Sequence, residues 1–347
     1  MILVNNPGSW GSIFPPLEHA EWNGCTPTDL VFPFFLFIVG VSMWFSFKRY
    51  DHLLTSASAY KIAKRAFLIF MVGLILTAFP FYNMHPEKIR ILGVLQRIGL
   101  AFGFGAFICI GIKDTYHKFI GALLLLGYWF ALVHWGGDDP YSLTTNLVRK
   151  IDLSILGPAH LWKGKGIPFD PEGLLSTIPA IVSVILGYHS GKILDENKGE
   201  AGVNLLLVNG LILVFVGMMW NLVMPINKSL WTSSFVVYTA GLGMCVLGVS
   251  IWLIDIKGNK RIVKPFIEFG SNAMFVFVAS GLLVKTFGKI LIADGNDKVG
   301  LSEYIYSHIY KPVDGAEISS VLYAITWVFL MWIIAHLLYK KNIFVKI

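Results

Sequence analysis

Long apolar runs recur along the whole chain and constrain its fold more than any other feature. Each run holds about 20 residues with few charges, the length that an α-helix needs to cross a lipid bilayer. Only 14% of the 347 residues are charged and 55% are hydrophobic, which leaves too little polar surface for a water-soluble protein of this size. The sequence therefore predicts an all-α polytopic membrane protein, a bundle of about nine to ten transmembrane helices forming a single domain over residues 1–347. The nine whole spans are predicted near residues 29–47, 63–82, 91–112, 119–135, 174–190, 203–222, 235–254, 266–288 and 318–338.

Basic residues concentrate in the connections on one side of these predicted helices. Those connections and the tail after Tyr339 hold 16 of the 28 Lys and Arg residues, counting Lys64 and Arg65 at a helix end. The positive-inside rule assigns this side to the cytoplasm, so we expect a cytoplasmic C-terminus and a location in the bacterial inner membrane. Topology then explains the net charge of +7, and no nucleic-acid partner is expected. The basic connections are residues 48–63, 113–118, 191–202 and 255–265, and the extracytoplasmic loops are 8–28, 136–173, 224–234 and 289–317.

The three cysteines cannot form a disulfide framework. Cys109 and Cys245 lie inside apolar runs, whereas Cys25 lies just before a helix start on the extracytoplasmic side. We therefore expect an impermeant maleimide to label Cys25 in intact spheroplasts, while the other two thiols stay protected.

The first six residues, MILVNN, predict the last turns of a helix whose beginning is absent from the sequence. A basic n-region and a full h-region are both missing, so this segment is not a signal peptide. We expect the genomic reading frame to extend upstream through roughly 20 mostly apolar residues to a basic start. The alternative is a helix that exists only as this stub.

The loop before the first whole span combines a helix start with a cluster of polar and aromatic residues. Thr26 is a suitable N-cap, Pro27 suits the first helical position, and Asp29 completes a capping box. Helix capping accounts for these three residues better than any chemistry does. A loop histidine is more often a solvated bystander, and an interfacial tryptophan is usually a membrane anchor. Capping leaves unexplained the residues Glu18, His19, Glu21, Trp22 and Asn23.

Five motifs in a fixed order resemble the signature of the heparan-alpha-glucosaminide N-acetyltransferase family of membrane acyltransferases. The resemblance implies transfer of acetyl from cytosolic acetyl-CoA, the cosubstrate, to the amine of a terminal glucosamine on the outer side. It also implies that His19 is the catalytic residue and that Asn5 is its partner. The family usually opens with a complete first helix containing an LDxxRG-like stretch, and this sequence begins after it. The motifs are VNNPGSW followed by PLEHAEWNGCTPTDLVFPFFLFIVG, GVLQRIGL at 93–100, FDPEGLLSTIPAI at 169–181, PINKSLWTSSFVVYTAG at 225–241 and GSNAMFVF at 270–277.

Acetyl transfer to an amine needs a neutral nucleophile, a proton acceptor and a donor for the oxyanion of the tetrahedral intermediate. His19 suits the second role, because imidazole accepts a proton near neutral pH. Asn5 suits the third role through its amide N–H groups. Two mechanisms stay open: the amine attacks acetyl-CoA directly, or His19 first accepts the acetyl group as an acyl-imidazole.

Further polar residues are candidates for binding the two substrates, and each has a structural alternative. Asp170 and Glu172 precede a predicted helix, so capping is the favoured explanation for both. Arg97 lies inside an apolar run, where an internally paired or snorkelling arginine is equally plausible. The candidates for the sugar are Glu18, Trp22, Asn23, Asp170, Glu172, Lys228 and Trp231, and those for CoA are Gln96, Arg97 and Asn272, the last within a helix predicted from about Pro265.

The expected partners are an amino-sugar acceptor, CoA and the lipid bilayer, and association into a homodimer is left open. No HExxH, CxxC, P-loop or GxGxxG context occurs, and the nine histidines are scattered along the sequence, so no metal is expected. The competing function is a secondary transporter of an amino sugar or small anionic solute, which also places polar residues at depth. That class predicts internal repeats and paired broken helices, and neither is clear in the sequence.

Overall fold

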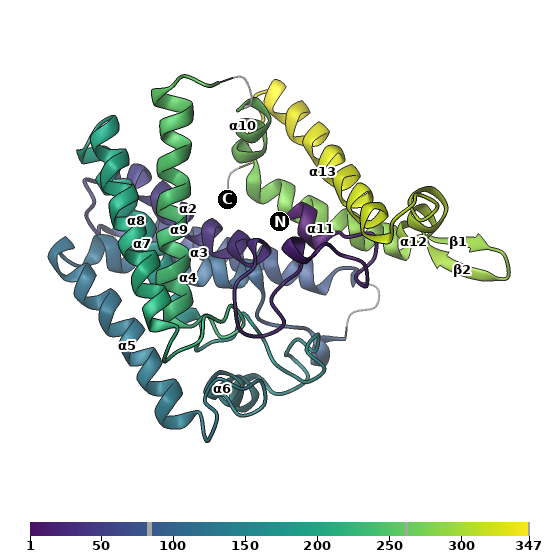
Figure 1. The fold of residues 1–347 in the computed structure, drawn as a ribbon, viewed down its shortest axis with the longest axis horizontal. Helices are drawn as coiled ribbons and strands as arrows, with labels where there is room; N and C mark the ends of the chain where they lie inside the picture. The colour runs from purple at the N-terminus through teal and green to yellow at the C-terminus, as the bar shows by residue number, and fades with distance from the viewer. Residues whose placement is uncertain (82–84, 261–262, 346–347) are drawn as a thin grey trace.

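The computed structural model describes residues 1–81, 85–260 and 263–345, and helices dominate it (Figure 1). Within these described residues, seven helical segments are long and apolar enough to cross a membrane. The predicted class, an all-α polytopic membrane protein, is confirmed. The helices of these seven spans are α2 (Val31–Phe47), α4 (Val94–Gly111), α5 (His117–Trp135), α7 (Thr177–Glu196), α8 (Glu200–Trp220), α9 (Ser233–Ile251) and α13 (Ala316–Lys340).

The span predicted over 63–82 corresponds to helix α3 (Ser56–Ala78), which pairs with α4. Three basic residues, Lys61, Lys64 and Arg65, lie in its N-terminal half, so this half is less apolar than the rest of the helix. The helix ends before the predicted boundary, and residue 82 itself lies outside the described residues.

The span predicted over 266–288 is broken in the structure. Helices α10 (Lys264–Ser271) and α11 (Ala273–Lys289) meet at 79°, so the prediction of one whole span here is wrong. The break falls at Asn272, whose φ of −133° and ψ of 31° lie outside the helical region. Hydropathy gives no sign of the break, because the two helices together form one apolar stretch long enough for a span.

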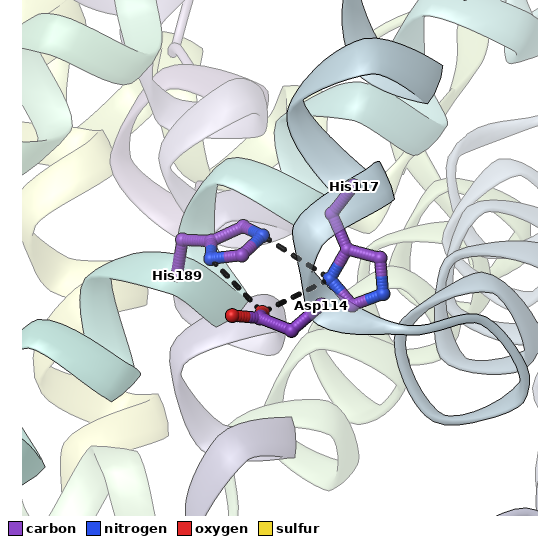
Figure 2. Close-up of side chains that lie close together, drawn as sticks. All are labelled: Asp114, His117 and His189. Carbon is purple, nitrogen blue, oxygen red and sulfur yellow. Dashed lines mark hydrogen bonds and ion pairs between the residues drawn. The ribbon is translucent and has the colours of Figure 1, made fainter.

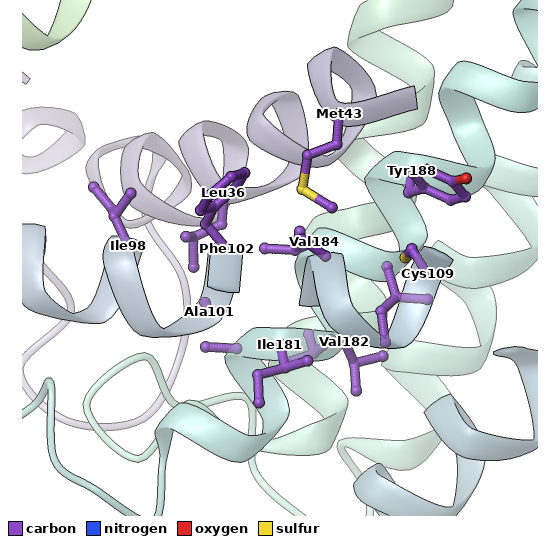
Figure 3. Close-up of a cluster of buried hydrophobic side chains, with 14 of the residues drawn as sticks. Leu36, Met43, Ile98, Ala101, Phe102, Cys109, Ile181, Val182, Val184 and Tyr188 are labelled. Carbon is purple, nitrogen blue, oxygen red and sulfur yellow. The ribbon is translucent and has the colours of Figure 1, made fainter. Parts of the chain in front are cut away.

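Helices α2, α4 and α7 form the centre of the largest hydrophobic core (Figure 3). Leu36 of α2 and Val184 of α7 are completely buried in it. Gly40 of α2 and Gly187 of α7 face each other's backbones, and a Cβ on either residue would overlap the opposite helix. The two helices therefore pack closer than larger side chains would allow.

The remaining elements are short. Helix α1 (Ile2–Asn5) agrees with the helical turn predicted for MILVNN, and it packs against α13. The other elements are α6 (Leu147–Leu156), α12 (Leu301–Ile305), an antiparallel hairpin of β1 (Leu291–Asp294) and β2 (Asp297–Gly300), 3₁₀ turns at Pro15–Leu17, Pro27–Leu30, Lys48–Tyr50, Pro86–Lys88 and Asp114–Tyr116, and π turns at Trp252–Ile256 and Tyr306–Tyr310.

Candidate active site

The N-terminal loop is held against two other predicted extracytoplasmic loops. Gly24 forms a parallel β-bridge with Asn227 in the loop before α9, and its φ of 108° suits glycine better than any other residue. The Trp22 indole N–H donates to the Tyr141 carbonyl, in the loop after α5, at 2.7 Å. Loops predicted on the same side of the membrane therefore meet, which is the arrangement that a shared site requires.

His19 and Asp29 form a close pair within this loop. His19 Nδ1 lies 2.7 Å from Asp29 Oδ1. Asp29 Oδ2 accepts the backbone N–H groups of Ala20 at 3.0 Å and of Thr26 at 3.1 Å, so the carboxylate is fixed by the chain around it. The Asp29 side chain is 1% exposed, whereas that of His19 is 46% exposed. A proton on Nδ1 that is donated to Asp29 leaves the lone pair of Nε2 as an acceptor, and the Lys228 Nζ lies 3.5 Å from Nε2.

The capping box predicted from the sequence is present at the same carboxylate. Thr26 and Asp29 bond to each other reciprocally at the start of the 3₁₀ turn that leads into α2. Asp29 therefore begins the helix and also orients His19. The sequence interpretation identified only the first of these two roles.

Lys228 approaches this pair from the loop before α9. Its Nζ lies 3.1 Å from His19 Nδ1 and 3.3 Å from Asp29 Oδ1. Burial lowers the pKa of Lys228 from its ordinary value, and the negative charge of Asp29 opposes that shift. The site thus joins an imidazole, a buried carboxylate and a partly buried amine.

A cavity of about 470 Å³ opens beside these groups. It is lined by five of the residues predicted for the site, which are Asn5, His19, Trp22, Glu172 and Lys228. It is also lined by residues that were not predicted, among them Trp10, Asp29, Arg90, Trp162 and Lys165. The structure therefore gathers side chains from five separate segments, with charged groups of both signs and three indole rings, around one space.

Arg90 binds the two carboxylates of the DPEG segment. Its Nε and Nη2 donate to the two oxygens of Asp170 at 2.8 and 2.7 Å, and Nη2 also contacts Glu172. Burial alone would lower the pKa of Arg90, but the hydrogen bonds to Asp170 and the charge of Glu172 raise it above its ordinary value. Helix α7 begins only at Thr177, so the expectation that Asp170 and Glu172 cap that helix is wrong. Asp170 instead accepts the Glu172 N–H in a local turn, at 3.0 Å.

Residues 17–218 match the family described as heparan-alpha-glucosaminide N-acetyltransferase, catalytic. The chain belongs to this family. Relatives named "Heparan-alpha-glucosaminide N-acetyltransferase" from Homo sapiens and Mus musculus are each 28% identical to it, over 100% of this chain and 58% of the relative. The chain thus spans a little more than half the length of the relatives that it matches. The resemblance predicted from the motifs is confirmed.

The match to the heparan-alpha-glucosaminide N-acetyltransferase family covers most of the residues that line the cavity. The matched range contains His19, Asp29, Arg90 and Glu172, and it ends before Lys228. The loop that supplies Lys228 therefore lies outside the matched range in the sequence but contacts residues of that range in the folded chain.

Two residues predicted for the site of this family member lie in the core instead. Arg97 is fully buried, donates to the Gly173 carbonyl at 3.2 Å and contacts the Ser176 hydroxyl. Its guanidinium lies 5.1 Å from the ring centre of Trp231, which is 1% exposed. Arg97 therefore has no surface for a CoA phosphate and Trp231 has no face for a sugar, which favours the internally paired alternative for Arg97.

The other predicted residues divide between the loop surface and the interior. Glu18 and Asn23 are exposed without lining the cavity, and Asn23 Oδ1 accepts the Asn227 side-chain amide at 3.0 Å. Gln96 is 1% exposed and contributes to the packing of α3 against α4. Asn23 therefore fastens two loops together, and Gln96 lies inside the bundle.

Asn272 lies at the break between α10 and α11 and contacts the C-terminal segment. Its side-chain amide donates to the Ile343 carbonyl at 3.0 Å, and its Oδ1 accepts the Val345 N–H at 2.8 Å. Its assignment to CoA stays a prediction. Its observed partners belong to the chain's own tail.

Sequence reasoning missed Asp29 as the histidine partner and Arg90 as the partner of the acidic pair. Capping fully explained Asp29, and ten residues separate it from His19, so no periodicity links the two. Arg90 lies on the predicted extracytoplasmic side. The positive-inside rule explains basic residues on the cytoplasmic side only, so it does not explain Arg90. That exception is the signal by which Arg90 could have been found.

Proposed function

We propose that the chain is a membrane-bound acetyltransferase that moves acetyl from cytosolic acetyl-CoA to the amine of a glucosamine-type sugar on the extracytoplasmic side. The membrane is the bacterial inner membrane, with the C-terminus in the cytoplasm. The observation that supports this most is the contact of His19 with the buried Asp29 at a cavity, 2.7 Å between Nδ1 and Oδ1, in a chain of this family. The relatives' names supply the reaction class and the sugar class.

In direct transfer, His19 acts as the general base. The neutral amine attacks the acetyl carbonyl carbon, and Nε2 of His19 takes the amine proton as the new C–N bond forms. The C–S bond then breaks, and the CoA thiolate leaves and receives that proton. Asp29 holds the imidazole in the required tautomer and stabilises the imidazolium that forms, the role that a buried aspartate has in a Ser-His-Asp triad.

In the relay alternative, Nε2 itself attacks the acetyl carbonyl and CoA leaves as the thiolate. The amine then attacks the acyl-imidazole, the bond from the acetyl carbon to Nε2 breaks, and the restored lone pair of Nε2 takes the amine proton. Both routes pass through a tetrahedral oxyanion. The amide of Asn5 and the ammonium of Lys228, which both line the cavity, are the donors that we assign to it.

The remaining lining residues suit a sugar. Trp22 and Trp162 offer indole rings for the apolar face of a pyranose, and Glu172 offers a carboxylate for hydroxyl groups. Arg90 fixes Glu172 in place, so we assign it a positioning role.

The test is acetylation of glucosamine by the purified protein with radiolabelled acetyl-CoA. His19→Ala should reduce turnover by roughly 10²- to 10⁴-fold, because that is what a positioned general base contributes. Asn5→Ala should lose about 10²- to 10³-fold if its amide is an oxyanion donor. His85→Ala is the matched control, since His85 is an exposed loop histidine that pairs with Glu87 and does not line the cavity. Normal turnover by His19→Ala would refute both mechanisms.

Incubation with labelled acetyl-CoA and no acceptor separates the two mechanisms. Acetyl trapped on His19 after a quench in mild base supports the relay, and its absence supports direct attack. The same measurement in His19→Ala controls for acetyl bound elsewhere.

One observation favours the transporter alternative. Helices α10 and α11 meet at 79°, and broken helices are typical of secondary transporters. Such folds place a second broken helix in the other half, and the described residues contain one bent pair. Counterflow of labelled glucosamine in liposomes without acetyl-CoA would support transport, and acetylation without counterflow supports the enzyme.

A further inference from the structure

Three potential metal ligands meet where α5 begins, at the predicted cytoplasmic end of α7 (Figure 2). Asp114 lies in the 3₁₀ turn before α5, His117 is the first residue of α5, and His189 lies on α7. Asp114 Oδ1 is 3.3 Å from His117 Nδ1, which is 3.3 Å from His189 Nε2. The histidines looked scattered in the sequence because 72 residues separate these two. The fold brings them together, and their spacing in the sequence gives no sign of this.

The hydrogen bonds of His117 determine which of its nitrogens can bind a cation. Nε2 lies 3.0 Å from the Ile112 carbonyl oxygen, which can only accept, so Nε2 carries the proton. The neutral ring then presents the lone pair of Nδ1 toward Asp114 and His189. A histidine whose second nitrogen donates to a backbone carbonyl is the usual arrangement among metal-bound histidines.

We propose that Asp114 Oδ1, His117 Nδ1 and His189 Nε2 bind a divalent zinc ion. Bonds of about 2.0–2.1 Å in a tetrahedron place neighbouring ligand atoms roughly 3.3–3.4 Å apart, and two of the observed separations are 3.3 Å. His189 binds through Nε2 as the tautomer with its proton on Nδ1, and that Nδ1 lies 3.7 Å from Asp114 Oδ1. Two imidazoles and one carboxylate form a typical zinc ligand set, which leaves the fourth position for water.

The second oxygen of Asp114 is engaged by Lys192. The Lys192 ammonium contacts Asp114 Oδ2 at 2.5 Å, so the carboxylate offers Oδ1 to the ion and Oδ2 to the lysine. This contact orients the carboxylate, as outer-shell partners of metal ligands do. The positive charge of Lys192 also opposes a cation, and it therefore weakens the site.

Burial of the two imidazoles distinguishes this cluster from a solvated group of polar side chains, while the Asp114 side chain is 45% exposed. The side chain of His117 is 1% exposed and that of His189 is 19% exposed. All three ligands line the edge of a cavity of about 780 Å³ whose other walls are mainly apolar. An ion here would fasten the start of α5 to α7. The proposal of this metal site does not depend on the acetyltransferase function proposed above.

The test uses the full chain, purified in detergent and stripped of metal with a chelator. Titration with Zn²⁺ against a chromophoric chelator should give one equivalent per chain, and Co²⁺ should give the strong visible absorption of tetrahedral coordination. His189→Ala and Asp114→Asn should each weaken Zn²⁺ binding at least 10- to 100-fold, since even outer-shell changes cost that much. His134→Ala is the matched control, because His134 lies on the same helix and stacks on Phe130 outside the cluster.

Lys192→Met separates the metal site from a purely hydrogen-bonded cluster. Removal of its positive charge should tighten Zn²⁺ binding several-fold, whereas it would only weaken a cluster held by hydrogen bonds. Zn²⁺ should also raise the thermal midpoint of the wild type and leave that of His189→Ala unchanged, with helical content checked by circular dichroism. Equal Zn²⁺ uptake by the wild type, His189→Ala and Asp114→Asn would overturn the proposal, as would binding of Mn²⁺ in preference to Zn²⁺.

Discussion

Asp29 links the stability of a helix to the proposed chemistry through a single carboxylate. Its Oδ2 accepts the N–H groups of Ala20 and Thr26, and its Oδ1 contacts His19. A carboxylate fixed by backbone donors cannot follow a moving imidazole, so the imidazole is held where the helix start places it. The geometry of the proposed base therefore depends on how α2 begins.

Substitutions at the two ends of the capping box should separate these roles. Asp29→Asn keeps an acceptor for the helix start but loses the charge beside His19, so turnover should fall roughly 10²- to 10⁴-fold. Thr26→Ala removes a capping hydroxyl, should cost about 1 kcal/mol of stability and should leave turnover nearly unchanged. Acetylation rates and thermal midpoints of both variants test this.

A pH profile of kcat/KM provides the further readout for Asp29 as a positioning residue. Asp29→Asn should shift the limb of the kcat/KM profile that reports protonation of His19, whereas Thr26→Ala should leave that limb unchanged. Equal losses of turnover in the two variants, with unchanged profiles, would mean that Asp29 acts only through the helix.

At the scale of elements, short helix α6 supports the DPEG segment through Asp152. This residue is fully buried, and its Oδ1 accepts the Leu174 N–H at 2.9 Å. Burial raises the pKa of Asp152 to about 7, and the hydrogen bond from Leu174 opposes that shift. The folded chain therefore keeps a proton that the unfolded chain, with an ordinary carboxyl pKa of about 3.9, has lost at neutral pH.

The pH dependence of stability follows from this difference. Between about pH 4 and pH 7 the folded state binds more protons at Asp152 than the unfolded state does, so its contribution to stability falls as pH rises. The contribution is fully present below about pH 4 and lost above about pH 7. Asp152→Asn should therefore be more stable than the wild type at pH 8, by on the order of a few kcal/mol, and close to it at pH 4. Thermal midpoints across this range check the prediction, and parallel curves for the two proteins would contradict it.

The apolar runs in the sequence predicted where most of the helices lie. They did not predict the helix break or the distant polar contacts. Apolar runs of bilayer length have one stable solution in lipid, since every backbone group must be bonded within the segment. The break at Asn272 depends instead on contacts with Ile343 and Val345, about 70 residues away, which no local pattern contains. The pairing of Arg90 with Asp170 was hidden for the same reason, because the two lie 80 residues apart.

At the scale of the whole molecule, the positive-inside rule predicted which loops share a side, and the structure brings several of them together. The Trp22 contact with Tyr141 and the Gly24 bridge to Asn227 join loops that were assigned to the extracytoplasmic face. Motif order identified His19 as a candidate for the site. Five of the predicted residues line the cavity, but the rest of its lining could not be predicted, because it depends on how five segments fold over one another.

The proposed mechanism requires His19 to face the side opposite the basic loops, and cysteine labelling tests that sidedness. The labelling of Cys25 that the sequence suggests stays a prediction, and we expect this thiol to react slowly. Burial, reinforced by the charge of Asp29, raises the pKa of its thiol to about 12. Roughly 10⁻⁵ of such a thiol is ionised at pH 7, and the thiolate is the form that reacts with maleimide.

Two introduced cysteines at exposed positions avoid this problem. Glu21 lies in the loop of His19, and Lys257 lies in a connection predicted to be cytoplasmic; both are exposed. Glu21→Cys should react with an impermeant maleimide in intact spheroplasts, and Lys257→Cys only after permeabilisation, because the basic connections stay inside. The opposite pattern would put His19 and cytosolic acetyl-CoA on the same side, so that acetyl would not need to cross the membrane and the transmembrane transfer would be wrong even if His19 is the base.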